Sequence, residues 1–454
     1  MGDSHGFKAG TRHLWSRLAS LPRAAGAALS GFTAAWLDSS ELRRSPQDLH
    51  WNESAVQSIL EILNKTAAIR RMEHTGGHPG PTGASHIPPI QGSAPAPSEL
   101  SSRDHLLLQR IRENVQDANK SNITRTRAYL QFYEAFPEVH WALLAHMVSR
   151  NAGWNMTDLK SGLMSDLVKD PFKDRLYRFL ERCNALIFQD AYPQLLLYQY
   201  SREQGRSCFH LLPHFHISSF MTPFWERFWL DRSSSPVLTV ALIINEQNYI
   251  EGRVVQNPMF RQNVLDHPSM KLFDIARLNQ VLFPLGSPNC RHDLFRESIL
   301  PLRPLAGLTM RQFKDVAARI RTGKALYAML FGYKDIYEGV MHFARCTDHH
   351  GSRSEYWPAL FTSRKQAAMA GEDASLELLE SEWRTYGDRL YSPRLEDVWY
   401  DNEYEPIPRY DWFQSTERLS HLKRPSRPLL IDMTHAHRFV LERIAFAHDA
   451  EEQF

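Results

Sequence analysis

Apolar residues along most of the chain recur at the spacing of helices rather than of strands. From about residue 103 onward they return every three or four positions and almost never alternate with period two. Such spacing puts the apolar side chains on one face of each helix, and that face is buried against other helices. The pattern therefore predicts an all-α fold, built as a single large multi-helix globular body.

Two breaks in the pattern divide the chain. Residues 75–98 contain five Gly, six Pro and no charged side chain, a composition that buries too little apolar area to offset chain entropy. We expect an N-terminal extension over residues 1–71, weakly helical from about Glu53 to Arg71. A disordered Pro/Gly-rich linker is expected over residues 72–102, and the body over residues 103–454.

The C-terminal part of the body, from about residue 372, has a different composition. Between Glu372 and Glu405 there are eleven acidic and three basic residues, with tryptophans and tyrosines among them. An acidic aromatic surface repels phosphate. Two interpretations remain open: a solvated segment wrapped around the body, or a docking surface for a basic partner.

Charge and motifs exclude several classes of function. Lys and Arg number 53 against 51 Asp and Glu, a net charge of +2, so no overall field attracts nucleic acid or an anionic membrane. The chain has no phosphate-binding G-x-x-x-x-G-K-[ST], no G-x-G-x-x-G after a strand and no G-x-S-x-G elbow. A small molecule or a protein is the favoured partner rather than nucleic acid.

Cysteine usage and apolar run lengths indicate a cytoplasmic protein. The four Cys form no C-x-x-C pair, which suits a reducing compartment. The longest apolar run, Pro236 to Ile244, is far shorter than the roughly 20 residues of a membrane-spanning helix, so we expect no transmembrane span. The basic stretch with Trp15, Phe32 and Trp36 is either a weakly ordered extension or an amphipathic helix in peripheral contact with a membrane.

Candidate site residues are polar side chains on otherwise apolar helix faces, because a buried polar group is costly unless its partners are built in. His140 shares an apolar stripe with leucines, and Asn184 shares one with Leu180 and Ile187. The helix that carries His140 is expected to end just before Gly153. The turn at its end offers a guanidinium, two amides and an indole. The ligand-binding candidates are His140, Arg150, Asn151, Trp154, Asn155, Asn184 and Asn248.

Two carboxylates are candidates for catalysis. Asp190 is expected either to cap a helix that begins there or to orient a histidine. Glu251 follows Asn248 on one helical face and is expected to act as general base or third metal ligand, or to pair with Arg150 or Arg253 in a structural ion pair.

Three histidines lie within seven residues, at His210, His214 and His216. In an extended segment His214 and His216 point the same way, a geometry that holds zinc or a similar divalent ion with a third ligand from elsewhere. They are therefore the metal candidates, and catalytic candidates as metal ligands or as general acid and base. The H-x-H motif is short, and no Cys pair, H-E-x-x-H or E-x-x-H accompanies it.

Several blocks of sequence resemble a known family. They are Asn122 to Tyr129, Glu138 to His146, Ser149 to Leu159, Phe188 to Leu195 and Leu212 to His216. In this order they are similar to the YppC-like family of Bacillus-type bacteria, domain of unknown function 2515. The likeness is strongest from about Asn122 to Gly286. It implies a Gram-positive bacterial source and implies no activity, substrate or catalytic residue.

Two functions follow from these residues. The favoured one is a non-catalytic binding or scaffold protein, in which a buried polar network fixes the register of the helices while the acidic segment or the N-terminal helix binds a partner. The alternative is a metal-assisted or His/Glu-dependent hydrolase with a polar pocket between helices, in which Arg150 holds an anionic group. The hydrolase requires the candidate side chains to converge on one concavity open to solvent.

Overall fold

The computed structural model describes residues 33–75, 100–162, 169–270, 279–286, 302–365, 389–402 and 411–441. Most of the predicted linker and most of the acidic segment lie outside these residues, as do Trp15 and Phe32, although helix α2 (Glu53–Thr75) includes the first residues assigned to the linker. Among the described residues, no helix combines the length and apolar character that crossing a bilayer demands.

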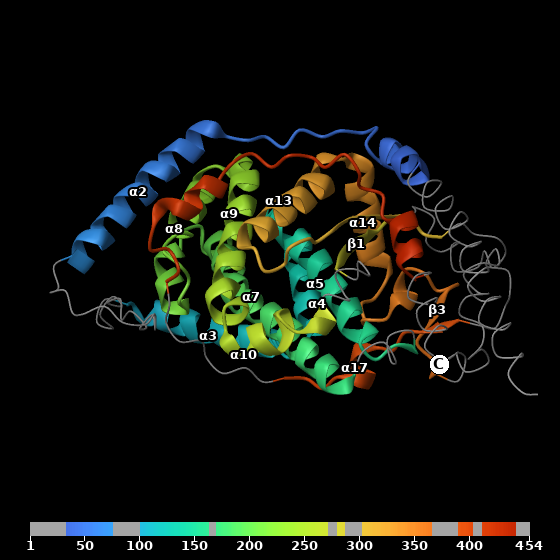
Figure 1. Cartoon of the computed structure of the whole chain (residues 1–454). Coiled ribbons are helices and arrows are strands. Elements are labelled where there is room, and N and C mark those ends of the chain that lie inside the picture. The colour runs from blue at the N-terminus through green and yellow to red at the C-terminus, as the bar shows by residue number, and fades with distance from the viewer. Residues whose placement is uncertain are drawn as a thin grey trace, which may run out of the picture.

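The structure is mostly helical, which confirms the predicted fold class (Figure 1). The α-helices are α2 (Glu53–Thr75), α3 (Ser102–Ala118), α4 (Asn122–Ala135), α5 (His140–Asp158), α7 (Asp170–Gln204), α8 (Thr222–Leu230), α9 (Ser235–Ile250), α10 (Pro258–Phe260), α13 (Val316–Gly332), α14 (Lys334–Cys346) and α17 (Leu395–Val398). Residues 33–42 and 434–441 are also helical. The 3-10 turns are η2 (Phe209–Phe215), η3 (Arg232–Ser234), η6 (Arg353–Glu355) and η7 (Thr416–His421), and the π-turns are η4 (Glu251–Val255) and η5 (Arg261–Leu265).

Helix α5 lies at the centre of the fold. It packs against α4, α7, α9, α13, α17 and β1, and its side chains from Trp141 to Met147 are almost all buried. A helix packed against this many elements has little solvent face for polar residues. Its arginine and asparagines must therefore find partners inside the protein.

Two small sheets accompany the helices, and the sequence pattern did not predict them. Strand β1 (Gln280–Pro284) pairs antiparallel with β2 (Leu305–Thr309), and β3 (Phe361–Thr362) pairs parallel with β4 (Leu390–Tyr391). An isolated bridge between Ala306 and Asp432 adds a third segment beside β2. Strands β3 and β4 have only two residues each, and β1 is buried at all five positions, so neither sheet shows a clear alternation of apolar and polar positions.

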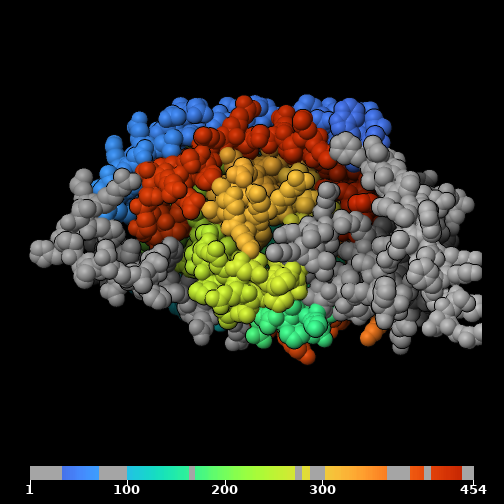
Figure 2. Space-filling model, viewed as in Figure 1, coloured from blue at the N-terminus to red at the C-terminus, as the bar shows by residue number. Residues whose placement is uncertain are grey.

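The N-terminal and C-terminal parts of the chain run side by side in opposite directions along one edge of the molecule (Figures 1 and 2). Ser39 contacts residues 431 and 432, and the carbonyl of Gln47 accepts a hydrogen bond from Arg427. Farther along, Arg70 donates to the Asp411 carboxylate and to the carbonyl of Phe413. Residues 33–75 are thus docked on the body along their whole length. The domain boundaries themselves remain predictions.

Two predicted helix ends were wrong. Helix α5 continues past Gly153 to Asp158, and Asp190 lies inside α7 rather than at a helix start. In both places the helix continues because its flanking residues are buried against neighbouring elements, and this packing outweighs local capping preferences. Helix α7 also includes Pro193.

Candidate functional site

A polar segment after α14, residues 347–356, folds back over α5 and supplies most of the buried charge near Arg150. The chain turns at Gly351, whose φ of +86° lies in the region that favours glycine. A Cβ there would meet the Cβ of Leu395 at 2.9 Å. The turn places Glu355 inside the protein, against α5.

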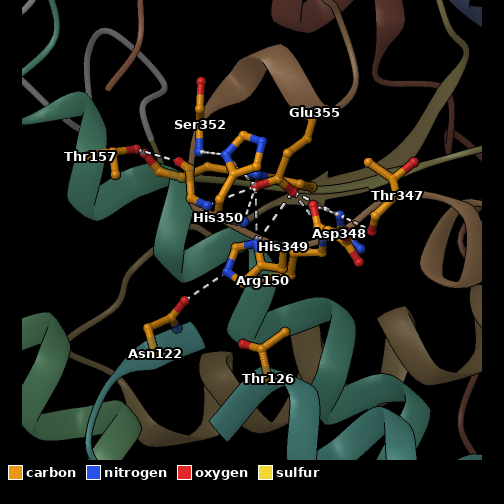
Figure 3. A network of polar contacts seen from close by, with 12 residues as sticks. Asn122, Thr126, Arg150, Thr157, Thr347, Asp348, His349, His350, Ser352 and Glu355 are labelled. Carbon is orange, nitrogen blue, oxygen red and sulfur yellow. Dashed lines mark hydrogen bonds and ion pairs between the residues drawn. The ribbon is translucent and has the colours of Figure 1, made fainter. Parts of the chain in front are cut away.

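The carboxylate of Glu355 is the centre of this segment (Figure 3). One oxygen, Oε2, accepts a hydrogen bond from Nε of Arg150 at 2.9 Å. The other, Oε1, accepts from the backbone N–H groups of His350 at 2.9 Å and Gly351 at 2.7 Å. Burial alone raises the pKa of Glu355, but His349 and Arg150 outweigh it and hold this pKa well below its usual range. Glu355 is therefore a buried carboxylate that stays ionised.

Arg150 makes further contacts that fix its guanidinium. Its Nη2 donates to the carbonyls of Thr347 at 2.7 Å and Asp348 at 3.1 Å, and the guanidinium lies 4.4 Å from the ring centre of Phe343. Burial lowers the pKa of Arg150. Arg150, which was expected to hold an anionic group of a ligand, thus binds the carboxylate of Glu355 and two backbone carbonyls of the protein itself.

His349 links Glu355 to α4. Its Nδ1 lies 3.1 Å from Glu355 Oε1, and its Nε2 lies 2.9 Å from Oδ1 of Asn122. The amide nitrogen of Asn122 donates to the carbonyl of Ser149, so its oxygen faces the ring and Nε2 carries a proton. Nδ1 also carries a proton when it donates to the ionised Glu355, which requires the charged ring. Burial lowers the pKa of His349, and the Glu355 carboxylate opposes this shift. We call Asn122, Arg150, His349 and Glu355 the Glu355 cluster.

Gly153 allows the close approach of α4, α5 and His349. A Cβ at this position would overlap Oδ1 of Asn122 and lie 2.7 Å from Nε2 of His349. A glycine inside α5 is therefore needed by packing, although glycine destabilises an ordinary helix interior.

A second buried cluster lies on the other side of η6. Arg353 pairs with Asp158 at 2.5 Å and donates to Oδ1 of Asn155 at 3.3 Å and to the Tyr356 hydroxyl. The same hydroxyl lies 2.9 Å from Nε2 of His437. The predicted residue Asn155 is thus a partner of Arg353.

Asn151 holds the edge of β1. Its amide donates to the carbonyl of Gln280 at 3.1 Å, and its oxygen accepts from the backbone N–H of Leu282 at 2.9 Å. Trp154 packs its buried ring against Tyr356, with ring centres 4.8 Å apart. Both residues occupy structural positions between α5 and its neighbours.

Asp190 belongs to a separate cluster between α7 and α9. Its Oδ2 accepts from Gln194 at 3.0 Å and from Asn245, while Oδ1 is buried without a hydrogen-bond partner. Asn245 in turn accepts from the indole of Trp412 at 2.8 Å. Burial raises the pKa of Asp190 to about 7.

Glu251 pairs with neither of the arginines expected for it. It forms an ion pair with Arg319 of α13 and accepts from Gln256 at 2.7 Å. The structural ion pair was one of the open alternatives, and its partner lies 68 residues away in sequence, which no local pattern indicates.

The remaining helix candidates also have partners within the protein. Nδ1 of His140 lies 3.0 Å from the hydroxyl of Tyr327, and its ring stacks on Phe331 at 4.2 Å. Burial lowers the pKa of His140 to about 4. Asn184 and Asn248 each donate to the carbonyl four residues earlier in their own helix.

His214 and His216 do not lie on an extended segment, so the geometry assumed for a shared metal ion is not met. His214 lies in η2, and His216 ends that turn in the left-handed conformation with φ 59°. The cause is Pro213, which fits a tight turn better than a strand. A metal ion at these two residues stays a prediction.

The described residues contain one group of three side chains that could hold a metal ion, formed by Asp38, Asp432 and His435. It lies apart from every predicted candidate. The structure thus distributes the candidates over several buried clusters and does not bring them together in one pocket.

The sequence analysis missed His349, Glu355, Arg353 and Asp158. Asp158 is the last residue of α5. The other three lie in the dense run Thr347-Asp348-His349-His350-Gly351-Ser352-Arg353-Ser354-Glu355-Tyr356 directly after an amphipathic helix, and this run is their signal. A run of this composition is typical of an exposed loop. Its burial follows from long-range packing on α5, which periodicity does not report.

Comparison with known proteins agrees with the resemblance in the sequence. The protein called "Uncharacterized protein YppC" of Bacillus subtilis (strain 168) is 36% identical over 317 residues, which are 69% of this chain and 93% of that protein. No solved structure matches the chain. A family model described as "Protein of unknown function (DUF2515)" matches residues 117–436, and the chain belongs to this family.

Proposed function

We propose that this protein is a non-catalytic binding or scaffold protein whose buried polar clusters hold its helices in register. The observation that carries the proposal is the environment of Glu355. Both of its oxygens accept hydrogen bonds from the protein, and its arginine and histidine partners are themselves engaged by α4, α14 and the 347–356 segment. A carboxylate whose hydrogen bonds are all made within the protein in this way connects three segments and is not available to a substrate.

The placement of the other candidates supports the same function. Asp190 binds α7 to α9, Glu251 binds η4 to α13, and Asn151 binds α5 to β1. Each joins elements far apart in sequence. A hydrolase would need these groups at one place open to solvent, so the hydrolase hypothesis is the weaker one.

The binding surface of such a scaffold is proposed to be the N-terminal helix or the acidic segment. Helix α2 supports the first choice. One face packs on α8 and η7, while Ile62, 49% exposed, and Ile69, 58% exposed, lie seven residues apart on another face. Exposed large apolar side chains on one helix face suit a protein partner.

An activity assay on the full chain separates the two functions. The protein is incubated with chromogenic esters, phosphoesters and glycosides, with and without Zn²⁺ or Mn²⁺, beside the variants Glu251→Gln and His214→Ala with His216→Ala. We expect rates equal to buffer in all samples. Turnover by the wild type that falls more than tenfold in either variant would establish the hydrolase and overturn the proposal.

Binding is tested by photocrosslinking in cells that express the chain. A photoreactive amino acid at Ile69 is expected to give a reproducible adduct with one protein, and the same group at the exposed polar position Glu61 of α2 is the control. Equal labelling of many proteins from both positions would contradict a specific surface on α2.

A further inference from the structure

The group formed by Asp38, Asp432 and His435 lies where the two terminal parts of the chain meet. One ligand atom from each residue lies within 4.8 Å of the other two. Oδ2 of Asp38 and Nε2 of His435 are already 2.9 Å apart. Two ligands on a common zinc ion, with bonds of about 2.0 to 2.1 Å, lie roughly 3.3 Å from each other. The pair therefore needs only a small movement to share an ion.

Asp432 gives a second, independent indication of a cation. The residue is 2% exposed. Its Oδ2 accepts from the hydroxyl of Thr434 at 2.8 Å, whereas Oδ1 is buried with no hydrogen-bond partner. An ionised carboxylate in this state is costly unless a positive charge compensates it. A bound cation supplies that charge.

The backbone holds the ligands in place. The hydroxyl of Ser39, next to Asp38, accepts hydrogen bonds from the N–H groups of Ile431 at 3.0 Å and Asp432 at 2.8 Å. Asp432 also forms a bridge with Ala306 beside β2. The carboxylates of residues 38 and 432 are thus fixed near each other by contacts that do not involve their own side chains.

We propose that Asp38, Asp432 and His435 bind one divalent transition-metal ion. The imidazole favours zinc or iron over calcium or magnesium, and the two carboxylates also suit manganese and lower the net charge of the bound ion. Asp38 and His435 are partly exposed, with 48% and 36% of their side chains accessible. That exposure gives the ion an entry path and leaves room for water as the remaining ligand.

The ion would act as a clamp between the ends of the chain. It joins the helix at residues 33–42 to the segment that pairs with β2, and so reinforces the antiparallel run between the N-terminal and C-terminal parts. Because the site exists only in the folded chain, the binding free energy of the ion adds to the stability of the folded state. The inference does not depend on the proposed scaffold function, because a clamp serves an enzyme equally well.

The test uses the full chain without a metal-binding tag, stripped with chelator and titrated with Zn²⁺, Mn²⁺, Mg²⁺ or Ca²⁺ alone. We expect one equivalent of Zn²⁺ or Mn²⁺ and a higher melting temperature on binding. Asp38→Asn and His435→Gln, at partly exposed positions, are each expected to weaken binding at least tenfold and to abolish the thermal shift. Glu41→Gln is the matched control, because Glu41 lies on the same helix and pairs only with exposed Arg44.

Three results would overturn the proposal. The first is the absence of binding by Zn²⁺ and Mn²⁺. The second is binding that survives both variants and is lost instead in Cys346→Ser, because the exposed Sγ of Cys346 lies 3.3 Å from Nδ1 of His342 and is a rival zinc ligand. The third is a thermal shift of the same size in Asp38→Asn as in the wild type.

Discussion

Replacing Glu355 by glutamine tests whether the buried cluster holds the fold together. The substitution keeps the shape of the side chain and removes its charge. In the wild type Oε2 faces two nitrogens of Arg150, and Oε1 faces the N–H groups of His350 and Gly351. Glutamine has one oxygen and one NH₂ group, so a donor must face a donor on one side whichever way the amide is turned.

The expected loss is large because a buried arginine would lose its counter-ion. Breaking one partner of a buried ion pair typically costs about 3 to 5 kcal/mol. Each buried backbone N–H left without an acceptor costs about 1 to 3 kcal/mol. Replacing Arg150 by methionine in the same chain removes the unpaired charge and is expected to recover part of the loss, since two apolar or neutral groups carry no uncompensated charge.

The assay is urea unfolding followed by far-ultraviolet circular dichroism and tryptophan fluorescence. Glu355→Gln is expected to lower the transition midpoint clearly, and Arg150→Met combined with Glu355→Gln to lie between it and the wild type. Glu396→Gln, an exposed glutamate of α17, is the control and should match the wild type. A midpoint for Glu355→Gln within error of the wild type would refute the structural role assigned to the cluster.

Two further substitutions probe burial and close packing. Burial raises the pKa of Asp190 to about 7, above its unfolded value of about 3.9, so its charged form is disfavoured in the folded state and the wild type loses stability as the pH rises from 4 to 7. Asp190→Asn removes this pH dependence. The difference in unfolding free energy between wild type and Asp190→Asn should therefore change by roughly 1 to 3 kcal/mol between pH 5 and pH 8. Parallel pH profiles of the two unfolding free energies would contradict this prediction. Gly153→Ala should destabilise the protein by roughly 1 to 3 kcal/mol in thermal unfolding, because the new Cβ overlaps Asn122 and His349. The control Gly162→Ala, whose new Cβ lies 3.8 Å from its nearest neighbour, should not destabilise it. A Gly153→Ala variant more stable than the wild type would show that the contact relaxes freely.

The sequence predicted the all-α class and identified polar residues on otherwise apolar helix faces, but it did not predict which residues those side chains contact. Arg150 and Asn151 stand out because they follow an apolar stretch of helix, but they were expected in a turn at its end, whereas the structure buries both inside α5. Glu355 is 205 residues from Arg150 along the chain, and spacing carries no information over such distances. The same reason explains why Glu251 was matched with Arg150 or Arg253 rather than with Arg319.

Local preferences misled where packing outweighs them. Asp190 is a good capping residue and Gly153 a good terminator, yet both lie inside helices whose sides are buried. For His214 and His216 the expected geometry assumed an extended backbone, in which two histidines two residues apart point the same way. Instead, His214 lies in a 3-10 turn that includes Pro213, and His216 ends that turn.

The family match shows which cluster residues lie in the matched region and which are contributed by the N-terminal segment. All four residues of the Glu355 cluster lie within the matched residues 117–436, whereas Asp38 lies outside them and Asp432 and His435 lie inside. A chain that consists of the matched region alone can form the cluster, but it lacks one of the three proposed metal ligands and every contact made by residues 33–75. In the proposed function the buried clusters hold the helices of the body in register, and the proposed ion would fasten an additional segment of this chain to that body.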